Sequence, residues 1–439
     1  MYPPLGLAYV AAALRQADFP RLRVLDAHAL GLSGEELRAF LRAHPAEVVL
    51  FTAATLVWPN IVKAARLVKE AHPSCLVGAG GPQLSAYPEE SLACPDIDFG
   101  IRGEGEAAAV QALRAIASRQ DLGDAAGAVI RKEGRIIARP AAVIEDLDAL
   151  PFPAVDLLPL RAYRAWNVDH PFFSMVTSRG CPFACRFCSL THSGQPFRMR
   201  SAGSVVDEME LYVRRYRARE IIVFDETFTV DRQRVLDICR EIAARGLRFR
   251  WNIRTRVDTV DEGMLAALRQ AGCRGLHMGV ESGSQEILDA MGKGITLAQV
   301  RGAFRAARRL GFETRGYFMI AYPGETLETI RRTLALSREL DLDWASFTIT
   351  IPNPGTALCG DLAGDYWRDY VLGRTDAPAP FFTTADYTAA ALCRIRERAY
   401  RDFYLRPGFL LGKLFSRNAW RLLRNMVHNA PLLARSIAR

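Results

Sequence analysis

Apolar and polar residues follow two alternating patterns along the N-terminal third of the chain. Runs of aliphatic and β-branched residues alternate with stretches in which apolar residues recur at helical spacing. The pattern predicts strands at residues 22–25, 47–52, 75–78 and 99–101. It predicts helices at residues 5–15, 34–42, 61–71 and 107–117. Because strands and helices alternate, we expect a doubly wound, Rossmann-like parallel sheet with binding loops at the carboxyl ends of its strands.

A second series of strand and helix signals begins near residue 172. The predicted strands are residues 173–177, 220–224, 248–253, 275–279, 313–320 and 344–349. The predicted helices are residues 204–216, 232–244, 262–271, 285–291, 297–310 and 327–340. Repeated βα units at this spacing favour a partial TIM barrel, (β/α)6, whose chemistry lies at the carboxyl ends of the strands.

The chain is expected to have four parts. The proline-rich stretch IEDLDALPFPAVDLLP is typical of an extended linker between domains. After about residue 376 the pattern changes to an aromatic-rich, basic helix. We therefore expect a Rossmann-like domain at residues 1–137, a linker at 138–168, a barrel at 169–375 and a helical C-terminal region at 376–439.

Three clustered cysteines carry the first chemical signal. Cys181, Cys185 and Cys188 are spaced by four and three residues, with Gly180 and Pro182 beside the first, and this pattern indicates a loop around a metal. Zinc usually takes four protein ligands or paired motifs. A [4Fe–4S] cluster takes one thiolate per iron, so three thiolates would leave one iron open. The alternatives are a structural zinc with a further ligand elsewhere, or three unrelated cysteines.

The stretch VTSRGCPFACRFCSLTH, with Phe187 as its aromatic residue, resembles the signature of the radical S-adenosylmethionine (SAM) enzymes. The resemblance implies a [4Fe–4S] cluster on Cys181, Cys185 and Cys188, with SAM bound to the open iron. It also implies reductive cleavage of SAM to a 5′-deoxyadenosyl radical that abstracts a hydrogen atom from a substrate.

Three N-terminal stretches, PPLGLAYVAAALR, GAGGPQLSAYPEE and IRGEGE, resemble the cobalamin-binding domain of the B12-dependent branch of this superfamily. The resemblance implies a flavodoxin-like fold and cobalamin contacts in the loops after the strands, namely at Thr52, Thr55, Gly80, Gly81 and Glu104. The alternative is a Rossmann-like domain that binds no ligand and serves as scaffold.

Two features depart from that branch. In relatives PPLGLAY follows a first strand, so we expect the true start of the protein to lie upstream. Asp26-Ala-His28-Ala-Leu-Gly31 matches a cobalt-binding pattern of cobalamin mutases, but it follows what would be the second strand. We therefore expect His28 to be a surface residue near a helix start.

By the same resemblance, the strand ends of the barrel carry the SAM site. Glu226 takes the position that holds the ammonium group of SAM, with Asp225 as second choice. The donors of Asn252 and Arg254 are candidates for the SAM carboxylate or for substrate. The remaining candidates are Glu281 and Ser282 for the ribose, although Ser282 fits a turn equally well, and Tyr322 beside the adenine. We assign no catalytic residue.

The composition of the chain limits where the protein is expected to act and which partners it is expected to have. The chain has nine cysteines, an odd number, and no secretory signal, which favours a reducing cytoplasm. No apolar run reaches the length of a membrane span. The formal charge is +9, and the basic C-terminal region predicts either peripheral contact with an anionic membrane or an ordinary packing helix. No recognised nucleic-acid-binding module is present, so we expect no nucleic-acid partner.

The sequence therefore predicts a cobalamin-dependent radical SAM enzyme with a [4Fe–4S] cluster, SAM and cobalamin as cofactors. We expect a methyltransferase that acts on an unactivated carbon of a small or lipid-like metabolite, with flavodoxin or ferredoxin as electron donor. One alternative is a cyclisation or oxidative rearrangement without net methyl transfer. Another is a catalytically impaired cluster-binding protein.

Overall fold

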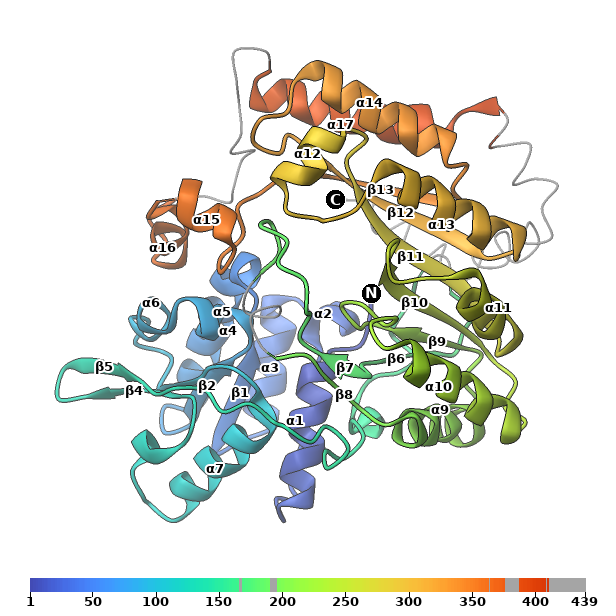
Figure 1. The fold of residues 1–439 in the computed structure, drawn as a ribbon. Helices are drawn as coiled ribbons and strands as arrows, with labels where there is room; N and C mark the ends of the chain where they lie inside the picture. The colour runs from blue at the N-terminus through green and yellow to red at the C-terminus, as the bar shows by residue number, and fades with distance from the viewer. Residues whose placement is uncertain (166–167, 190–195, 363, 376–386, 408, 410–439) are drawn as a thin grey trace.

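The computed structural model describes residues 1–165, 168–189, 196–362, 364–375, 387–407 and 409. Two sheets organise this part of the chain (Figure 1): a five-stranded N-terminal sheet and a six-stranded sheet formed by the second half. A short two-stranded ribbon, β7 (Ser178–Arg179) with β8 (Arg198–Met199), flanks the segment that carries the clustered cysteines. The predicted α/β class with two sheet-based units is confirmed.

The N-terminal sheet is mixed, with strand order β1-β2-β3-β4-β5. Its strands are β1 (Val48–Thr52), β2 (Leu76–Gly80), β3 (Phe99–Ile101), β4 (Ala128–Lys132) and β5 (Arg135–Ala138). The first three are parallel, and β4 and β5 form an antiparallel hairpin that closes one side. Its helices are α1 (Leu5–Gln16), α2 (Ala27–Leu30), α3 (Gly34–Ala43), α4 (Trp58–Ala71), α5 (Pro82–Ala86), α6 (Pro88–Leu92) and α7 (Gly105–Ala117).

Two sequence predictions for this sheet are wrong. Residues 22–25 form no strand, because Val24 packs against α1 and the linker instead of pairing with a neighbour. A short apolar run cannot by itself show whether a strand partner is available. The β4–β5 hairpin was not expected, so the sheet is mixed and not wholly parallel. The prediction for His28 is confirmed, since it is exposed on α2, whose first turn is capped by Asp26.

The second sheet is a parallel half-barrel with strand order β6-β9-β10-β11-β12-β13. Its strands are β6 (Phe172–Met175), β9 (Glu220–Val223), β10 (Arg250–Arg256), β11 (Cys273–Glu281), β12 (Glu313–Ile320) and β13 (Trp344–Ile349). The connecting helices are α9 (Ala202–Tyr216), α10 (Arg232–Ala244), α11 (Glu262–Gln270), α12 (Gln285–Ala290), α13 (Leu297–Arg309) and α14 (Leu327–Glu339). The predicted partial barrel is confirmed, although β10 continues past its predicted end at residue 253.

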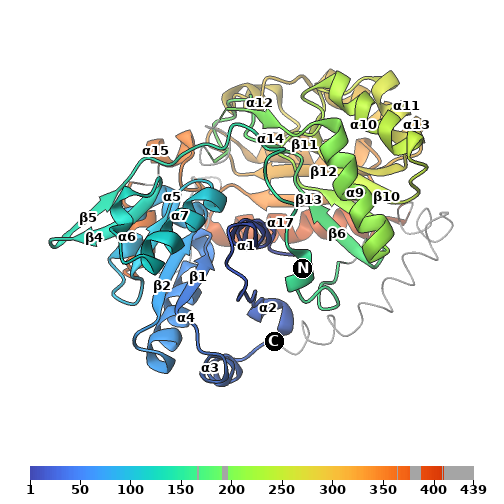
Figure 2. The same cartoon turned by 90° about the horizontal axis from the view of Figure 1, so that it is seen from below.

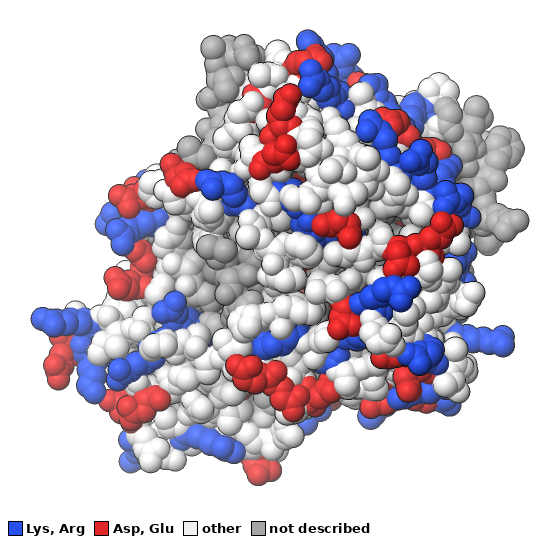
Figure 3. Space-filling model, viewed as in Figure 1, with Lys and Arg blue, Asp and Glu red and all other residues white. Residues whose placement is uncertain are grey.

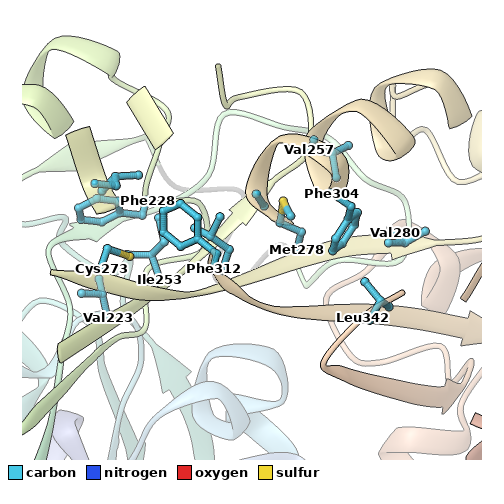
Figure 4. Packing of buried hydrophobic residues seen from close by; sticks show 14 of the residues in the cluster. Val223, Phe228, Ile253, Val257, Cys273, Met278, Val280, Phe304, Phe312 and Leu342 are labelled. Carbon is cyan, nitrogen blue, oxygen red and sulfur yellow. The ribbon is translucent and has the colours of Figure 1, made fainter. Parts of the chain in front are cut away.

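Alternation along the barrel strands separates a dry face from an inner face. Ile253 and Met278 are buried in the main core together with Phe304 of α13 (Figure 4). Phe318 belongs to the same buried cluster. The residues between them, such as Arg254 and His277, lie on the opposite, inner face. Hydrogen-bonded N-caps fix where the outer helices begin; they are Ser201, Asp231, Asp261, Thr296 and Thr326.

The C-terminal helix α17 (Ala389–Tyr404) covers the open edge of the half-barrel. The hydroxyl groups of Tyr400 and Tyr404 accept hydrogen bonds from the backbone N–H groups of Phe347 and Ala345 in β13, at 3.1 and 3.0 Å. For residues 389–404 the structure thus favours the packing-helix alternative over a membrane-lying one. Residues 410–439, the rest of the predicted basic tail, lie outside the described residues.

Two short helices, α15 (Ala357–Leu362) and α16 (Tyr366–Val371), connect the barrel back to the N-terminal domain. Tyr370 donates a hydrogen bond to the carbonyl of Leu56, at 3.0 Å, and Arg368 pairs with Glu90 at 2.6 Å. Figure 2 shows α1 between the two sheets. Within the described part of the chain, no helix combines the length and apolar character needed to cross a membrane.

Candidate functional site

A cavity of about 470 Å³ lies between the N-terminal domain and the half-barrel. One wall is formed by α1 and by the carboxyl ends of β1, β2 and β3. The other is formed by barrel residues, namely Val176, Ser178, Arg179, Gly180, Phe224 and Glu226. Most of the predicted cobalamin residues line it, namely Thr52, Gly80, Gly81 and Glu104. Thr55 does not, since it is buried at the start of a 3-10 turn (Thr55–Val57).

The cavity exists because the loops around it are small and tightly turned. Gly81 has a φ of +94°, and a Cβ atom there would lie 2.9 Å from the carbonyl oxygen of Ala53. Gly80 adds no side chain to the wall. The N-terminal side therefore presents backbone and small side chains to a ligand, which suits a large flat group such as a corrin ring.

Glu104 belongs to an ion-pair network that joins the two domains. Its carboxylate lies 3.0 Å from the guanidinium of Arg198 and 3.2 Å from that of Arg179, and Arg179 also pairs with Glu106 at 2.5 Å. Burial opposes ionisation, but the hydrogen bonds from Arg198 and from the N–H of Ile144 outweigh it and lower the pKa of Glu104. Glu104 is therefore a fixed anion at the cavity wall.

The three clustered cysteines lie on one partly exposed loop after β7, all with free thiols. The loop is tied down by two backbone hydrogen bonds of Arg186, from its N–H to Met291 and to its carbonyl from Leu358. Arg256 at the end of β10 donates to the Sγ of Cys185 at 3.5 Å. Among the described residues no three His, Cys, Asp or Glu side chains are already gathered as a metal cage.

This donor set fits an iron–sulfur cluster better than zinc. It is all sulfur, it lies on a partly exposed loop, and Arg256 donates a hydrogen bond to one of its sulfur atoms. Residues 190–195, just beyond the third cysteine, lie outside the described residues. The three thiols are the ligands that this loop offers for a cluster with one open iron.

Glu226 and Asp225, the two carboxylates after β9, have different surroundings. Asp225 is buried and accepts hydrogen bonds from the N–H of Thr177, at 2.6 Å, and from the hydroxyl group of Ser178, also at 2.6 Å. Its role is to hold the segment before the cysteine loop. Glu226 is exposed and lines the cavity. The structure thus leaves Glu226 available for a ligand, as expected from the sequence.

Asn252 lies deeper than the sequence suggested, since β10 extends to residue 256. Its amide donates to Glu220 at 3.1 Å, near the amino end of β9, and its Oδ1 is buried without a partner among the described residues. Arg254 is one level higher, with its guanidinium 4.3 Å from the ring centre of Phe224. The SAM assignment of Asn252 loses its support, because the cysteine loop lies at the other end of the strand.

Glu281 and Ser282 end β11 in a strained turn. Glu281 has a φ of +65° and accepts a hydrogen bond from the ammonium group of Lys293 at 2.8 Å, both side chains being buried. Ser282 is buried against Thr333 of α14 at 3.2 Å and accepts from the N–H of Ser284. Ser282 therefore fits the turn alternative, while Glu281 is paired with Lys293.

Tyr322 and Phe187 pack together in a small apolar cluster with Ile287 and Met291. The Tyr322 hydroxyl group donates to the carbonyl of Ala290 at 3.2 Å, and burial raises its pKa. The cysteine loop is thereby packed against the loop after β12. The contact brings the predicted adenine-side residue and the aromatic residue of the cysteine motif to one place.

Comparisons with known proteins agree with this geometry. Residues 1–113 match the family model of the B12 binding domain, and residues 175–337 match that of the radical SAM superfamily. An uncharacterized methyltransferase of Pyrococcus horikoshii is 32% identical over 431 residues, which cover 96% of this chain and 92% of the relative. The chain belongs to the cobalamin-dependent radical SAM enzymes.

Further relatives of this radical SAM enzyme include a cyclase and a methyltransferase. The anaerobic magnesium-protoporphyrin IX monomethyl ester cyclase of Rubrivivax gelatinosus is 29% identical over 93% of this chain and 75% of the relative. The methyltransferase TsrM of Kitasatospora setae, solved with tryptophan and a SAM analogue, has a TM-score of 0.71 at 21% identity, covering 82% and 72% of the two chains. Family membership confirms the predicted enzyme class and its cofactors, namely the [4Fe–4S] cluster, SAM and cobalamin.

Sequence reasoning missed two residues beside the cysteine loop and Glu281, namely Arg256 and Lys293. Arg256 contacts the cysteine loop, and Lys293 neutralises Glu281. Arg256 lies two residues after Arg254 and therefore on the same face of the strand. The sequence prediction missed Arg256 because it ended this strand at residue 253. Lys293 follows a helix by a short loop, and nothing in the sequence pairs it with Glu281.

Proposed function

We propose that this enzyme is a methyltransferase that acts on an unactivated carbon of a small-molecule metabolite. The observation that carries the proposal is the cavity that brings Thr52, Gly80 and Gly81 of the N-terminal domain face to face with Gly180 and Glu226 of the barrel. When bound, the cluster and SAM would supply a 5′-deoxyadenosyl radical, and cobalamin would supply a transferable methyl group. The 32% identical relative named as a methyltransferase supports this choice.

The chain's own residues would position these groups. Cys181, Cys185 and Cys188 would hold the cluster, with Arg256 fixing one thiolate. Glu226 would accept hydrogen bonds from the SAM ammonium group, while Glu281, held by Lys293, would face the ribose. The apolar side chains of α1 on the cavity wall, Leu5, Leu7 and Val10, would exclude water from the reacting carbon.

The remaining partners follow from this chemistry. Cleavage of SAM requires an electron, so we propose a small reduced donor such as flavodoxin or ferredoxin, in the cytoplasm. The charges on the face shown in Figure 3 are mixed, with Lys and Arg interspersed among Asp and Glu over the outer helices. Such a surface lacks the continuous basic stripe of nucleic-acid-binding proteins. Peripheral membrane contact through residues 410–439 stays a prediction.

The test is anaerobic reconstitution of the full chain with iron, sulfide and hydroxocobalamin, followed by metal analysis and reduction in the presence of methyl-labelled SAM. We expect one cluster and one cobalt per chain, 5′-deoxyadenosine, and label in an organic product when a metabolite extract is added. A cluster without cobalt would refute the methyltransferase. Cobalt and 5′-deoxyadenosine with an unlabelled, oxidised product would favour the cyclase chemistry named for the Rubrivivax relative, and no 5′-deoxyadenosine would favour an impaired enzyme.

A further inference from the structure

We propose that the inner face of the half-barrel binds the carboxylate or phosphate group of an anionic substrate between Arg254 and Arg315. The proposal rests on the function proposed above and narrows its substrate class. It excludes neutral lipids as the substrate of this enzyme. The argument starts from the register of the barrel strands.

Four side chains form a row across neighbouring strands at one level of the barrel. Arg254 of β10 is paired with His277 of β11, His277 with Arg315 of β12, and Arg315 with Trp344 of β13. Residues in register on adjacent parallel strands share a face and are spaced by one inter-strand distance, about 4.8 Å. The two arginines therefore flank His277 on the inner face, about two strand spacings apart.

The two guanidinium groups are left without protein counter-ions. The Nε atoms of Arg254 and Arg315 are both buried and have no hydrogen-bond partner among the described residues. Neither arginine takes part in any ion pair found in the described part of the chain, although this chain pairs many of its other arginines. A buried cationic donor without a partner is unfavourable unless a ligand completes it.

The neighbouring levels of the barrel differ in this respect. One level below, Asn252 donates to Glu220, and two levels below, Arg250 lies 3.4 Å from Glu313 and 3.7 Å from Asp169. One level above, Arg256 is held by both carboxylate oxygens of Asp258, each at 2.9 Å. The arginines above and below thus each have a carboxylate partner, although the Nε atom of Arg250 and the Oδ1 atom of Asn252 lack hydrogen bonds in the described part of the chain. Among the described residues, Arg254 and Arg315 have no carboxylate partner.

His277, between the two arginines, adds no positive charge to this level of the barrel. Burial and the nearby charges of Arg315 and Arg254 lower the pKa of His277 to about 3, so its imidazole is neutral at pH 7. The Tyr317 hydroxyl group lies 3.4 Å from the Nδ1 of His277. Two fixed cations with neutral donors between them match the shape and charge of a carboxylate or phosphate group.

The row lies next to the cofactor cavity. Arg254 stacks on Phe224 at 4.3 Å, and Phe224 is itself part of the cavity wall. Tyr2 packs on the same ring, with centroids 5.0 Å apart, and lies within electrostatic reach of both arginines. An acidic group held at this level would place the rest of a small substrate toward the cavity and the cysteine loop, where the reaction takes place.

The experiment measures binding of phenylphosphonate, and of benzyl alcohol as its neutral counterpart, to the cluster-reconstituted full chain. We expect phenylphosphonate alone to raise the melting temperature, with a half-saturating concentration at least about tenfold higher in Arg315→Gln and Arg254→Gln. Arg331→Gln is the matched control, because Arg331 is exposed on α14. Equal responses of wild type and Arg315→Gln, or no response of the wild type, would overturn the proposal.

A second titration distinguishes substrate from the carboxylate of SAM. We expect Arg315→Gln to bind SAM as tightly as the wild type does. A tenfold loss of SAM affinity in this variant, with no phenylphosphonate response in the wild type, would assign the arginines to SAM and overturn the substrate site. Neither titration needs cobalamin or turnover. The two binding results can therefore be interpreted even if the methyltransferase proposal fails.

A third measurement guards against variants that merely misfold. Arg315→Met removes a partly buried charge that has no ion pair among the described residues and keeps most of the bulk of the side chain. We therefore expect a higher melting temperature together with loss of the phenylphosphonate response. A lower melting temperature would show that Arg315 is satisfied within the protein. That outcome would also contradict the proposal.

Discussion

The N-terminal domain and the half-barrel present different kinds of chemical group to the ligands between them. On the N-terminal side, glycines and backbone line the cavity, and the charged Glu104 is already neutralised by Arg198 and Arg179. On the barrel side, charged side chains point inward at successive levels, and the two arginines of one level have no ion pair among the residues that the structure describes. The first wall suits a large ligand recognised by shape and contact area, and the second suits small polar ligands recognised by charge.

The difference explains why substitutions on the two sides should have separable effects. A side chain added to the N-terminal wall should displace cobalamin and leave the cluster intact. Changes in the barrel should affect the cluster, SAM or substrate while cobalamin still binds. The predictions below test this separation, from the largest expected effect to the smallest.

The largest effect is expected from the cysteine loop. Cys181→Ser removes one of three thiolates, so we expect loss of most of the reconstituted iron and no detectable 5′-deoxyadenosine. Cobalt content should stay near one per chain, because the N-terminal wall is untouched. Iron and cobalt analysis after anaerobic reconstitution, with quantification of 5′-deoxyadenosine, measures both.

The control for Cys181→Ser is Cys94→Ser, which lies in the N-terminal domain. Cys94 is partly buried in the N-terminal core, where burial raises its pKa and keeps the thiol unreactive. This variant should retain iron, cobalt and SAM cleavage. Equal iron loss in both variants would show that the cluster is not specific to the loop.

The second prediction concerns the N-terminal wall. Gly80→Leu places a branched side chain on the cavity wall, and its Cβ atom would be in van der Waals contact with the carbonyl oxygen of Ile101, at 3.4 Å. We expect cobalamin affinity to fall about tenfold or more, as for a steric clash of 1–2 kcal/mol, with iron content unchanged. Titration followed by corrin absorbance measures the affinity, and Gly203→Leu, on open space at the start of α9, is the matched control.

The third prediction compares two buried glutamates. Burial raises the pKa of Glu325, in the loop after β12, to about 7. Burial also acts on Glu104, but there the interactions with Arg198 and Arg179 outweigh it and lower the pKa. A raised carboxyl pKa means that the folded state holds the proton more tightly. The associated stability is present below the ordinary pKa and is lost as the pH rises through about 7.

Glu325→Gln should therefore flatten the decline in unfolding free energy between pH 5 and pH 8, by at most on the order of 3 kcal/mol. Glu104→Gln should act in the opposite sense, because a lowered pKa contributes stability above the ordinary value that is lost in acid. Urea unfolding at several pH values measures both. Parallel pH profiles of Glu325→Gln and wild type would contradict the prediction.

Much of the fold followed from periodicity, because each barrel strand has one face against helices and one inward. Residues 22–25 had the same apolar character and formed no strand, since their packing against α1 is a tertiary contact that no local pattern records. The β4–β5 hairpin escaped notice because its strands are short and its polar turn resembled the start of the linker.

The candidate site likewise contains residues that a local sequence pattern predicts and residues that it does not. Cys181, Cys185 and Cys188 were found because their ligand spacing is local, and Thr52, Gly80 and Gly81 because strand ends in a parallel sheet meet at one edge. Arg315 was not found, since its partner row crosses three other strands. Strand register decides which side chains meet, and it cannot be read from one strand alone.

The smallest predicted effect concerns the edge of the barrel sheet. The Tyr404 hydroxyl group accepts from the N–H of Ala345, at 3.0 Å, and donates to its carbonyl at 2.9 Å, so it satisfies backbone groups that a further strand would otherwise bind. Tyr404→Phe should lower the free energy of unfolding by about 1–2 kcal/mol, with cluster and cobalt content unchanged. Tyr216→Phe on α9, away from this edge, is the control for loss of a hydroxyl group in denaturant unfolding. Because the substitution leaves the inner face intact, a loss of phenylphosphonate binding in Tyr404→Phe would show that the edge contact also sets the register of the arginine row.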